Sequence, residues 1–236
     1  MKKSKKVGNK KTSQFDCSEI YRQLRTNIEF SSFEKDVQVV NLVSTNPKEG
    51  KSTIASNLAM VSAAKYPNVL LIDGDLRKPV QHQLFKVSNT LGLTDLIKDF
   101  EHFDVNDDTY FQKFKDKEGT GKLYLLTTGT KIPNPQEMLG SEKFKELMLK
   151  LRERFEFIVI DCPPISAVAD AIPIAKVSDG TVFVISATDT NKNDAKTALI
   201  QLRRNGVNIL GSVLTKVDVG ASNYYNYYYT NYTNDK

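Results

Sequence analysis

The chain has 236 residues, of which 40% are hydrophobic and 26% are charged, and its formal net charge is +5. This length suits one α/β domain with a complete hydrophobic core. No run of about 18 apolar residues is present, which excludes a transmembrane helix, and no apolar segment follows the basic N-terminus as in a secretory signal. The two cysteines form neither a disulfide framework nor a paired metal motif, so we expect a cytoplasmic protein.

The positive charge is concentrated at the N-terminus. Residues 1–11 hold six lysines and no acidic residue, whereas the remainder is close to neutral. A basic arm can bind anionic lipid or nucleic acid, but such a terminus is more often solvated. No nucleic-acid motif accompanies it, so we expect no nucleic acid partner. We therefore predict a flexible basic arm over residues 1–15.

Helical and strand patterns alternate from residue 16 onward, because helical spacing of apolar residues predicts helices and short continuous apolar runs predict buried strands. Predicted helices cover residues 16–30, 52–65, 93–100, 141–154, 167–176 and 193–205. Predicted strands cover residues 37–44, 69–72, 123–127, 157–160, 181–185 and 209–214. The charged and weakly apolar residues 101–121 predict a surface excursion.

This alternation predicts an α/β fold with a doubly wound, mainly parallel sheet and helices on both of its faces. We expect one domain over residues 16–219, because neither a linker nor an internal repeat interrupts it. In such sheets ligands bind at the carboxyl ends of the strands. Three polar motifs directly follow predicted strands, so we expect them to converge on one site.

The first motif lies between the strand 37–44 and the helix 52–65. A strand, a loop with Gly-Lys-Ser and a helix follow one another as in a P-loop, where backbone N–H groups and the helix N-terminus cradle phosphate oxygens. Lys51 would reach the β and γ phosphates, and the Ser52 hydroxyl would bind Mg²⁺. Thr45 and Lys48 stand where glycines are common, which weakens the motif taken alone. The predicted nucleotide-binding residues are Thr45, Asn46, Pro47, Lys48, Glu49, Gly50, Lys51, Ser52 and Thr53.

Two further motifs place carboxylates at strand ends. Asp73 and Asp75 follow one buried apolar strand, and Asp161 follows another. A buried carboxylate is costly unless a cation accompanies it, and Mg²⁺ together with Lys51 would supply that cation. A turn or cap would explain one such aspartate, but three of them beside a P-loop favour a catalytic metal site.

The three motifs together resemble those of the bacterial tyrosine kinases of capsule and exopolysaccharide synthesis. They read PKEGKST, LLIDGDLRKP and FIVIDCPP in this chain. The similarity extends from about residue 16 to the C-terminus and includes the connecting segments GLTDLI, LTTGTKIPNPQEML and ILGSVLTK. Two departures are Lys48, which replaces a frequent glycine, and Cys162, which stands where threonine is usual. The resemblance implies a P-loop NTPase fold like that of Min, Par and nitrogenase-reductase proteins.

The resemblance also implies ATP and Mg²⁺ as cofactors and assigns roles to the motif residues. Lys51 would hold phosphates, Ser52, Asp75 and Asp161 would organise Mg²⁺, and Asp73 would be the base for an incoming tyrosine. A tyrosine hydroxyl has a pKa near 10, so this base would mainly orient the hydroxyl and accept its proton late. Most catalysis would then come from positioning and charge neutralisation.

The C-terminal residues 220–236 contain a tyrosine cluster. Flexible tails are usually poor in aromatic residues, so this cluster needs an explanation. A low-complexity tail without a role is one interpretation; beside kinase motifs, sites of autophosphorylation are the favoured one. The predicted phosphoacceptors are Tyr224, Tyr225, Tyr227, Tyr228, Tyr229 and Tyr232.

The predicted first helix carries Glu19, Arg22 and Arg25 at a spacing of three residues. Alone, this pattern is a solvated face with one local ion pair. The resemblance implies an E-x-x-R-x-x-R segment that joins subunits into a ring-like homo-oligomer. It also implies a membrane-anchored adaptor of the polysaccharide co-polymerase type, which activates the kinase and recruits it to the inner face of the membrane, and a cognate tyrosine phosphatase.

Three other functions remain open. A Min- or Par-type ATPase switch would carry a lysine at the position of Asn46, so its absence and the tyrosine tail argue against that class. A GTPase is suggested by Thr215-Lys216-Val217-Asp218, which matches a guanine-binding pattern, although a strand end followed by a turn is the preferred explanation of these residues. The third is a tyrosine-rich scaffold without enzymatic activity, which an assay for phosphotyrosine with Mg-ATP would distinguish.

Overall fold

The computed structural model describes residues 17–31, 36–115, 121–166 and 169–218. The predicted basic arm and the tyrosine-rich tail therefore lie outside the described residues. Within the described ranges, no helix combines the length and the apolar character needed to cross a membrane.

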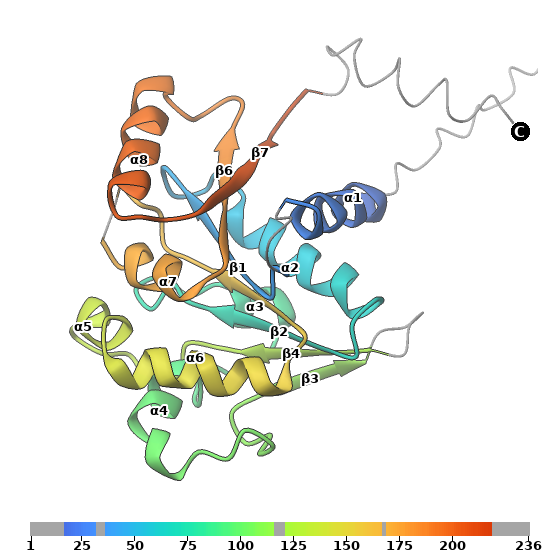
Figure 1. Ribbon diagram of the computed structural model, residues 1–236, viewed down its shortest axis with the longest axis vertical. Coiled ribbons are helices and arrows are strands. Elements are labelled where there is room, and N and C mark those ends of the chain that lie inside the picture. The colour runs from blue at the N-terminus through green and yellow to red at the C-terminus, as the bar shows by residue number, and fades with distance from the viewer. Residues whose placement is uncertain (1–16, 32–35, 116–120, 167–168, 219–236) are drawn as a thin grey trace, which may run out of the picture.

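The core of the fold is a seven-stranded sheet in the order β3-β4-β2-β5-β1-β6-β7 (Figure 1). All neighbouring strands pair in parallel except β3 and β4. This arrangement confirms the predicted mainly parallel α/β fold. The strands are β1 (Val39–Ser44), β2 (Asn68–Asp73), β3 (Gln112–Lys115), β4 (Lys122–Leu126), β5 (Phe157–Asp161), β6 (Gly180–Ser186) and β7 (Ile209–Thr215).

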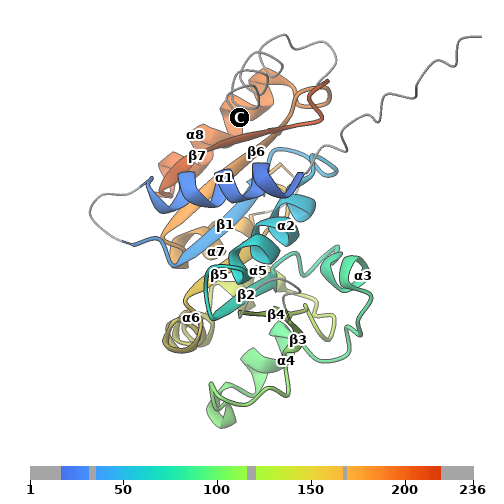
Figure 2. The same cartoon turned by 90° about the vertical axis from the view of Figure 1, so that its right-hand side faces the viewer.

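Helices cover both faces of this sheet (Figure 2). Residues of α1 and α2 pack in one apolar cluster, and residues of α4 to α8 pack in the other. The helices are α1 (Cys17–Glu29), α2 (Lys51–Ala63), α3 (Gln81–Phe85), α4 (Leu93–Lys98), the 3₁₀ helix η1 (Phe100–His102), α5 (Pro135–Leu139), α6 (Glu142–Arg154), α7 (Ala171–Val177) and α8 (Lys192–Arg204).

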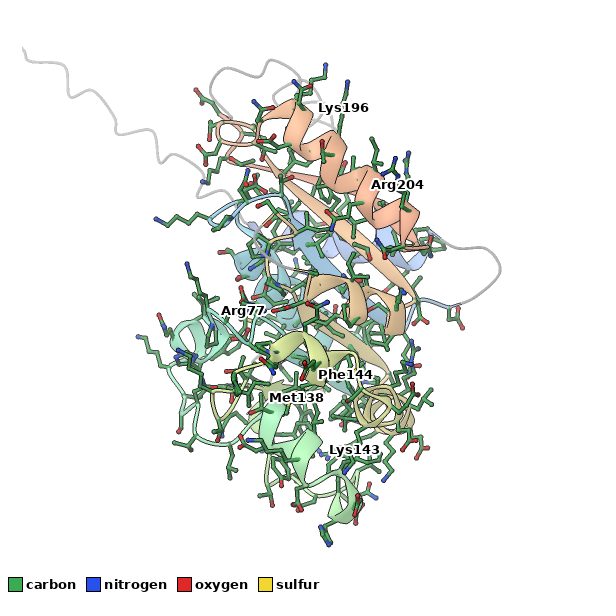
Figure 3. All side chains as sticks on the ribbon, turned by 90° about the vertical axis from the view of Figure 1, so that its left-hand side faces the viewer. Arg77, Met138, Lys143, Phe144, Lys196 and Arg204 are labelled. Atoms are coloured by element: carbon green, nitrogen blue, oxygen red, sulfur yellow. The ribbon has the colours of Figure 1, made fainter. Side chains whose placement is uncertain are left out.

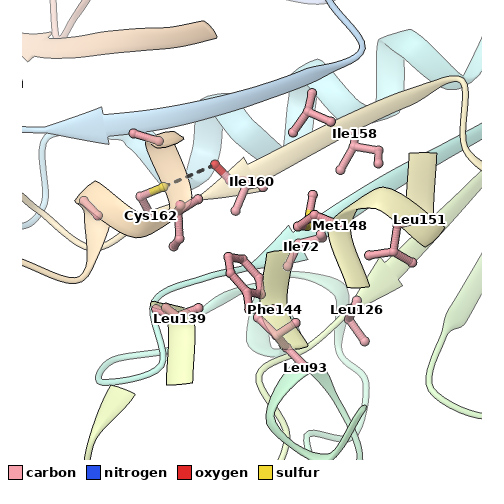
Figure 4. Close-up of a cluster of buried hydrophobic side chains, with 14 of the residues drawn as sticks. Ile72, Leu93, Leu126, Leu139, Phe144, Met148, Leu151, Ile158, Ile160 and Cys162 are labelled. Atoms are coloured by element: carbon pink, nitrogen blue, oxygen red, sulfur yellow. Dashed lines mark hydrogen bonds between the residues drawn. The ribbon is translucent and has the colours of Figure 1, made fainter. Parts of the chain in front are cut away.

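The central strands β1, β2 and β5 are buried on both faces because each face carries its own helical layer. Along β1, Val40 and Leu42 belong to the cluster beneath α2, whereas Val39 and Val43 belong to the opposite cluster. This alternation follows from the two-residue repeat of a strand. Figure 4 shows part of the second cluster, where Phe144 and Met148 of α6 lie close to Ile72 of β2.

The prediction of a surface excursion over residues 101–121 is only partly correct: most of its described residues are exposed or half-buried, but the segment is anchored to the core. Phe103 and Phe111 are buried in the core, and β3 pairs antiparallel with β4 at the sheet edge. The guanidinium group of Arg154 lies about 5 Å from the Phe111 ring, so one charged side chain also covers this segment. The short helices α3 and α5 were not predicted, and α7 begins at residue 171 rather than 167.

Candidate active site

The three predicted motifs meet at one edge of the sheet. They follow β1, β2 and β5, which are neighbours in the order β2-β5-β1 and run parallel. Asp73 and Asp161 occupy partner positions on adjacent strands, and the Gly74 N–H donates to the Asp161 carbonyl at 2.8 Å. The folded chain thus brings together carboxylates that are far apart in the sequence.

The loop between β1 and α2 has the backbone of a phosphate-binding turn. Lys48 and Gly50 both have positive φ, at 66° and 95°. This conformation costs a residue with a Cβ atom about 1–2 kcal/mol, which explains why glycine is common at the position of Lys48. Helix α2 begins directly after Gly50 at Lys51, and its first N–H groups have no acceptor within the helix. This helix end therefore favours an anion.

Glu49 fixes this loop to the neighbouring strands. Its side chain is almost completely buried. One carboxylate oxygen accepts from the N–H of Asn46 at 3.1 Å, and the other accepts from the Thr190 hydroxyl, beyond β6, at 2.6 Å. The Thr215 hydroxyl donates to the Glu49 carbonyl at 2.6 Å. The loop is therefore held in shape before any ligand binds.

The predicted nucleotide-binding residues divide into two groups. Pro47, Lys48, Gly50, Lys51, Ser52 and Thr53 line a cavity of about 600 Å³. Thr45, Asn46 and Glu49 lie outside its lining and support the loop from behind. The Thr45 carbonyl accepts from the N–H of Ser166, and the Asn46 side chain accepts from the Ser166 hydroxyl at 3.0 Å.

Lys51 lies between two of the predicted carboxylates. Its Nζ atom is 3.5 Å from Asp161 Oδ1 and 3.8 Å from Asp75 Oδ2. Burial disfavours the charged lysine, but Asp161 and Asp75 outweigh this cost and raise the pKa of Lys51. The lysine is therefore charged at neutral pH and stands at the base of the cavity.

Asp73 is completely buried, and both of its carboxylate oxygens accept backbone N–H groups. Oδ2 accepts from Val80 and Gln81 at 3.1 and 2.9 Å, and Oδ1 accepts from Asp75 at 3.4 Å. Burial and the adjacent Asp161 raise the pKa of Asp73. Asp73 is absent from the cavity lining, so in this arrangement it shapes the loop that follows β2.

Gln81 connects the three motifs and was not predicted. It is completely buried at the start of α3. Its Nε2 donates to Asp161 Oδ2 at 2.9 Å and to the Ser52 carbonyl at 3.1 Å. Because Asp73 holds the N–H of the same residue, Gln81 couples the β2 loop to both the P-loop helix and β5.

The donor set fits a divalent cation. Asp75 and Asp161 face one lysine, and Asp73, whose pKa is raised, lies beside Asp161. Burial raises the pKa of Asp75 despite the opposing effect of Lys51, and Asp161 Oδ1 is buried without a hydrogen-bond donor. In the described part of the chain, no three His, Cys, Asp or Glu side chains enclose a metal ion by themselves. Mg²⁺ commonly needs only one or two carboxylates, with phosphate and water completing its shell.

Part of the cavity lining is apolar and forms what we call the apolar wall. Val80, Leu84, Pro163 and Pro164 contribute to it, and they come from the loop after β2, from α3 and from the segment after β5. Leu84 is 52% exposed, so its side chain offers apolar surface to a ligand in the cavity. The site therefore combines a charged phosphate loop with a surface suited to a flat ring.

Arg77 borders the cavity and forms a two-point ion pair with the buried Asp170. The Nε and Nη2 atoms donate to the two carboxylate oxygens at 2.6 and 3.1 Å. Figure 3 shows Arg77 on the face between α8 and the α5–α6 segment. This pair fixes the arginine although its side chain is 43% exposed.

Thr215 and Lys216 of the predicted guanine-binding segment make contacts within the chain. The Thr215 hydroxyl donates to the backbone of Glu49 and Ile185, and Lys216 pairs with Asp189. Lys216 has a positive φ of 54°, which places it in a turn directly after β7. These contacts favour a strand end followed by a turn.

The predicted interface residues have different positions in the structure. Glu19 and Arg22 form an exposed ion pair at 3.3 Å. Arg25 is mostly buried, and it donates to the Val61 carbonyl of α2 at 2.8 Å and lies 3.4 Å from Glu29. Arg25 therefore attaches α1 to α2 within the subunit, while the other two residues remain available on the surface.

The amino-acid sequence is similar to several tyrosine-protein kinases, although no protein-family profile matches it. The chain is 39% identical to the tyrosine-protein kinase YwqD of Bacillus subtilis, with 90% of this chain and 86% of that protein covered. It is 34% identical to the tyrosine-protein kinase CpsD of Streptococcus pneumoniae, with 88% of each covered. It is 31% identical to the tyrosine-protein kinase wzc of Salmonella typhimurium and spans 29% of that longer protein.

Solved structures show the same relation. The crystal structure of the chimerical protein CapA2B2 superposes with a TM-score of 0.75 at 33% identity, with 86% of each chain covered. The kinase domain of the Escherichia coli tyrosine kinase ETK superposes with a TM-score of 0.74 at 28% identity, with 87% and 79% covered. The septum site-determining protein MinD of Pyrococcus horikoshii, at 21% identity and a TM-score of 0.58, shares the fold.

Proposed function

This chain belongs to the bacterial tyrosine-protein kinases, and we propose that it transfers the γ-phosphoryl group of ATP to tyrosines of its own C-terminal tail. The observation that carries the assignment of the site is the position of Lys51 between Asp75 and Asp161 at the base of the phosphate loop. A Min- or Par-type switch and a GTPase are not favoured, because the relatives that cover this chain are named as kinases and Thr215 and Lys216 are occupied within the fold.

The charged residues of the cavity suggest how the chain binds ATP and Mg²⁺. The N-terminus of α2 and Lys51 would hold the phosphates, and Ser52, Asp75 and Asp161 would hold Mg²⁺. The bound ion would neutralise charge on the phosphate oxygens during transfer. Lys51 retains its proton beside two carboxylates, so it can donate to the oxygens on which charge develops.

The apolar wall suggests where the acceptor tyrosine binds. We place the ring of the incoming tyrosine against Val80 and Leu84, with its hydroxyl toward the phosphates above Lys51. An aromatic ring buries substantial apolar area on such a surface. The wall would therefore position tyrosine without contributing to the chemical step itself.

We predict that Leu84→Ser raises the KM for a tyrosine peptide severalfold while the Kd for Mg-ADP stays unchanged. Serine removes most of the side chain that the ring would cover, a loss of about 1–2 kcal/mol. Leu84→Met is the matched control, because it keeps a flexible apolar surface and should retain the parent KM. Steady-state peptide kinetics measures the first quantity and calorimetric titration the second. An unchanged KM in Leu84→Ser would move the acceptor ring away from this wall.

The role of Asp73 as a base remains a proposal. The carboxylate accepts three backbone N–H groups and does not line the cavity. To accept a proton from tyrosine, it would first have to lose part of this hydrogen bonding. Its present geometry supports a positioning role, in which it holds Val80 and Gln81 in the arrangement that the acceptor wall and Asp161 require.

The proposed activity is tested by incubating the purified chain with Mg-ATP and measuring phosphotyrosine by mass spectrometry. We expect phosphate on the six tail tyrosines Tyr224, Tyr225, Tyr227, Tyr228, Tyr229 and Tyr232. Replacing all six by phenylalanine should remove most of the label while Mg-ADP binding persists. Equal labelling of the chain without these tyrosines would show that the tail is not the acceptor.

The biological setting is also part of this proposal. The resemblance in the three motifs supports a role in capsule or exopolysaccharide synthesis and export, with a cognate phosphatase that removes the tail phosphates. The wider similarity to wzc and to the CapA2B2 chimera supports a membrane-anchored adaptor that recruits this chain from the cytoplasm. Coexpression with a candidate adaptor and measurement of tail phosphorylation would test that partnership.

We propose that α1 also joins subunits, and that Glu19 and Arg22 carry this contact. The double variant Glu19→Ala/Arg22→Ala should lower the mass of the assembled protein toward that of a monomer with no change in thermal stability, because surface ion pairs contribute little to folding. Arg25→Ala should instead lower the free energy of unfolding by about 1–3 kcal/mol, because it loses its bond to α2. Light scattering with thermal melts separates the two effects. A parent protein that stays monomeric with Mg-nucleotide would contradict the assembly.

A further inference from the structure

A second hollow of about 400 Å³ adjoins the nucleotide cavity, and Arg77 borders both. The nucleotide and acceptor roles proposed above assign no function to this hollow. Its lining contains no acidic side chain, whereas Arg77, His82 and Lys131 contribute side-chain nitrogens. The lining residues are Leu76, Arg77, Pro79, His82, Gln83, Asn89, Thr94, Thr128, Gly129, Thr130 and Lys131.

Several side-chain nitrogens of the residues that line this hollow lack a hydrogen-bond partner. The Nδ1 atom of His82 is buried without a hydrogen-bond partner. Lys131 is exposed, and no carboxylate in the described residues pairs with it. Arg77 uses its Nε and Nη2 for Asp170, and Nη1 makes no bond among the described side chains. The hollow therefore favours a ligand rich in acceptor oxygens.

Asp170 and Asp95 stand close to this hollow, and both already accept hydrogen bonds. Asp170 is bonded at two points to Arg77. Asp95 lies behind the Gly129 turn, where its Oδ2 accepts from the N–H groups of Gly92 and Thr130 at 3.1 and 2.9 Å. The positive charge of Lys131 is consequently left uncompensated at the mouth of the hollow.

The wall of the hollow is formed in advance of binding. Asn89 Oδ1 accepts from the Gly129 N–H at 3.0 Å and from the Thr128 hydroxyl at 3.1 Å. Thr94 donates its hydroxyl to the Thr130 carbonyl at 2.7 Å. Gly129 has a φ of 77°, and a Cβ there would lie 2.1 Å from Asp95 Oδ2, so the turn requires glycine. A rigid polar wall reduces the ordering cost of binding.

A phosphate monoester on an aromatic ring fits this chemistry. Its oxygens carry about −1.5 to −2 charges near pH 7, and arginine and lysine are the usual partners of such a group. Leu76 and Pro79 supply apolar surface for the ring. In the tail, Tyr225, Tyr227 and Tyr229 stand two residues apart. In an extended chain such side chains share one face and lie about 6.6 Å apart along it.

We propose that this second hollow is a phosphotyrosine subsite. It holds a tail tyrosine that has already been phosphorylated while a neighbouring tyrosine occupies the acceptor cavity. A tail that carries one phosphate is then a better substrate than an unmodified tail, and phosphorylation proceeds along the cluster. This inference rests on the proposed function of the tail, since it extends the acceptor site beyond the residue that receives phosphate.

Peptide kinetics tests the subsite directly. Tail peptides with one acceptor tyrosine are compared with and without phosphotyrosine two residues away on either side. We expect kcat/KM to be about tenfold higher for the better of the two phosphorylated peptides, as one charge-assisted contact would give. Lys131→Glu and His82→Phe should abolish this preference and leave kcat/KM for the unphosphorylated peptide unchanged. Lys122→Glu, at the other end of β4, is the matched charge reversal and should keep the preference.

A binding measurement keeps this test separate from the kinase assignment. A fluorescent peptide whose only phosphorylatable position already carries phosphate is titrated against the full chain with saturating Mg-ADP. Anisotropy should show about tenfold tighter binding than for the tyrosine peptide, and Lys131→Glu should remove the difference. Equal binding of both peptides would overturn the subsite even if the protein is an active kinase. If the protein has no kinase activity but still binds the phosphorylated peptide more tightly, the subsite is supported and the proposed activity is wrong.

Mixing two variants of the chain shows whether the phosphorylated tail comes from the same chain or from a second copy. A Lys51→Met chain with an intact tail serves as substrate for an active chain whose six tail tyrosines are phenylalanine. Label on the Lys51→Met chain shows that a second copy supplies the tail, and Lys131→Glu in the active copy should then reduce multiply phosphorylated products. Products with several phosphates that form equally in the presence of Lys131→Glu would contradict the subsite.

Discussion

Lys51→Met should lower tail phosphorylation by at least about 100-fold, as loss of one charged donor at a transition state does in other enzymes. In the structure, Lys51 lies 3.5 and 3.8 Å from Asp161 and Asp75 at the cavity floor. Methionine has a similar length but no charge, so the phosphates lose this donor. The measurement is phosphotyrosine formed per chain with saturating Mg-ATP.

The fold should survive this substitution, because Lys51 stands at the edge of the sheet and not inside either apolar cluster. Circular dichroism checks that expectation. Lys65→Met is the matched control, since Lys65 follows the far end of the same helix and pairs there with Glu29. The control should keep the parent activity. Labelling of Lys51→Met at the parent rate would show that the P-loop assignment is incorrect.

Most of the sheet could be predicted because its strands are buried on both faces. In β1, β2 and β5 every described position but Asn68 is buried, so each reads as a continuous apolar run. The motif aspartates could be predicted for the same reason, since a carboxylate directly after such a run is conspicuous. Because parallel strands end at the same edge of a sheet, the proximity of these aspartates could be predicted as well.

The missed elements lack these signals. Helix α3 has five residues and is too short to show helical periodicity. Strand β3 reads QKFK, and its two lysines suggest a surface loop although Phe114 packs against the core. Each charged residue here lies on the outer side of an edge strand, where lysine is frequent. The sequence pattern of such a strand resembles that of a polar loop.

The contacts that shape the site were missed because they join distant residues. Glu49 bonds to Thr190, Arg77 to Asp170, and Gln81 to Asp161. A single sequence carries no signal for such pairs. The intrachain bond from Arg25 to the Val61 carbonyl is another such contact, because the spacing of Glu19, Arg22 and Arg25 gives no sign that one of them joins α1 to α2.

Asp73→Asn and Asp75→Asn should both lose phosphoryl transfer, for different reasons. Asp75 borders the cavity, so Asp75→Asn should weaken Mg-ADP binding. Asp73 holds the N–H groups of Val80 and Gln81. Both of these N–H groups donate to Oδ2 and the Asp75 N–H donates to Oδ1, so an asparagine, which accepts with only one atom, cannot keep all three bonds and the loop shifts. A misplacement of about 1 Å can reduce a rate by about 100-fold, so Asp73→Asn should bind Mg-ADP normally and turn over slowly.

Calorimetric titration of Mg-ADP and single-turnover transfer measure these two quantities separately. Asp99→Asn is the control for the loss of one aspartate, because Asp99 is exposed and pairs only with His102 and Tyr110 on the surface. Undiminished turnover in both Asp73→Asn and Asp75→Asn would contradict the roles that we propose for this motif.

The acidity of the acceptor decides whether Asp73 acts as a base or as a positioning residue. If Asp73 accepted the proton, a peptide with a fluorinated and more acidic tyrosine would depend on it less. The rate ratio of parent to Asp73→Asn would then shrink for that peptide. If Asp73 holds the loop, the same displacement affects both acceptors and the ratio stays constant. Because both carboxylate oxygens accept backbone N–H groups in the structure, we expect the constant ratio. A ratio that falls with acceptor acidity would restore Asp73 as the base.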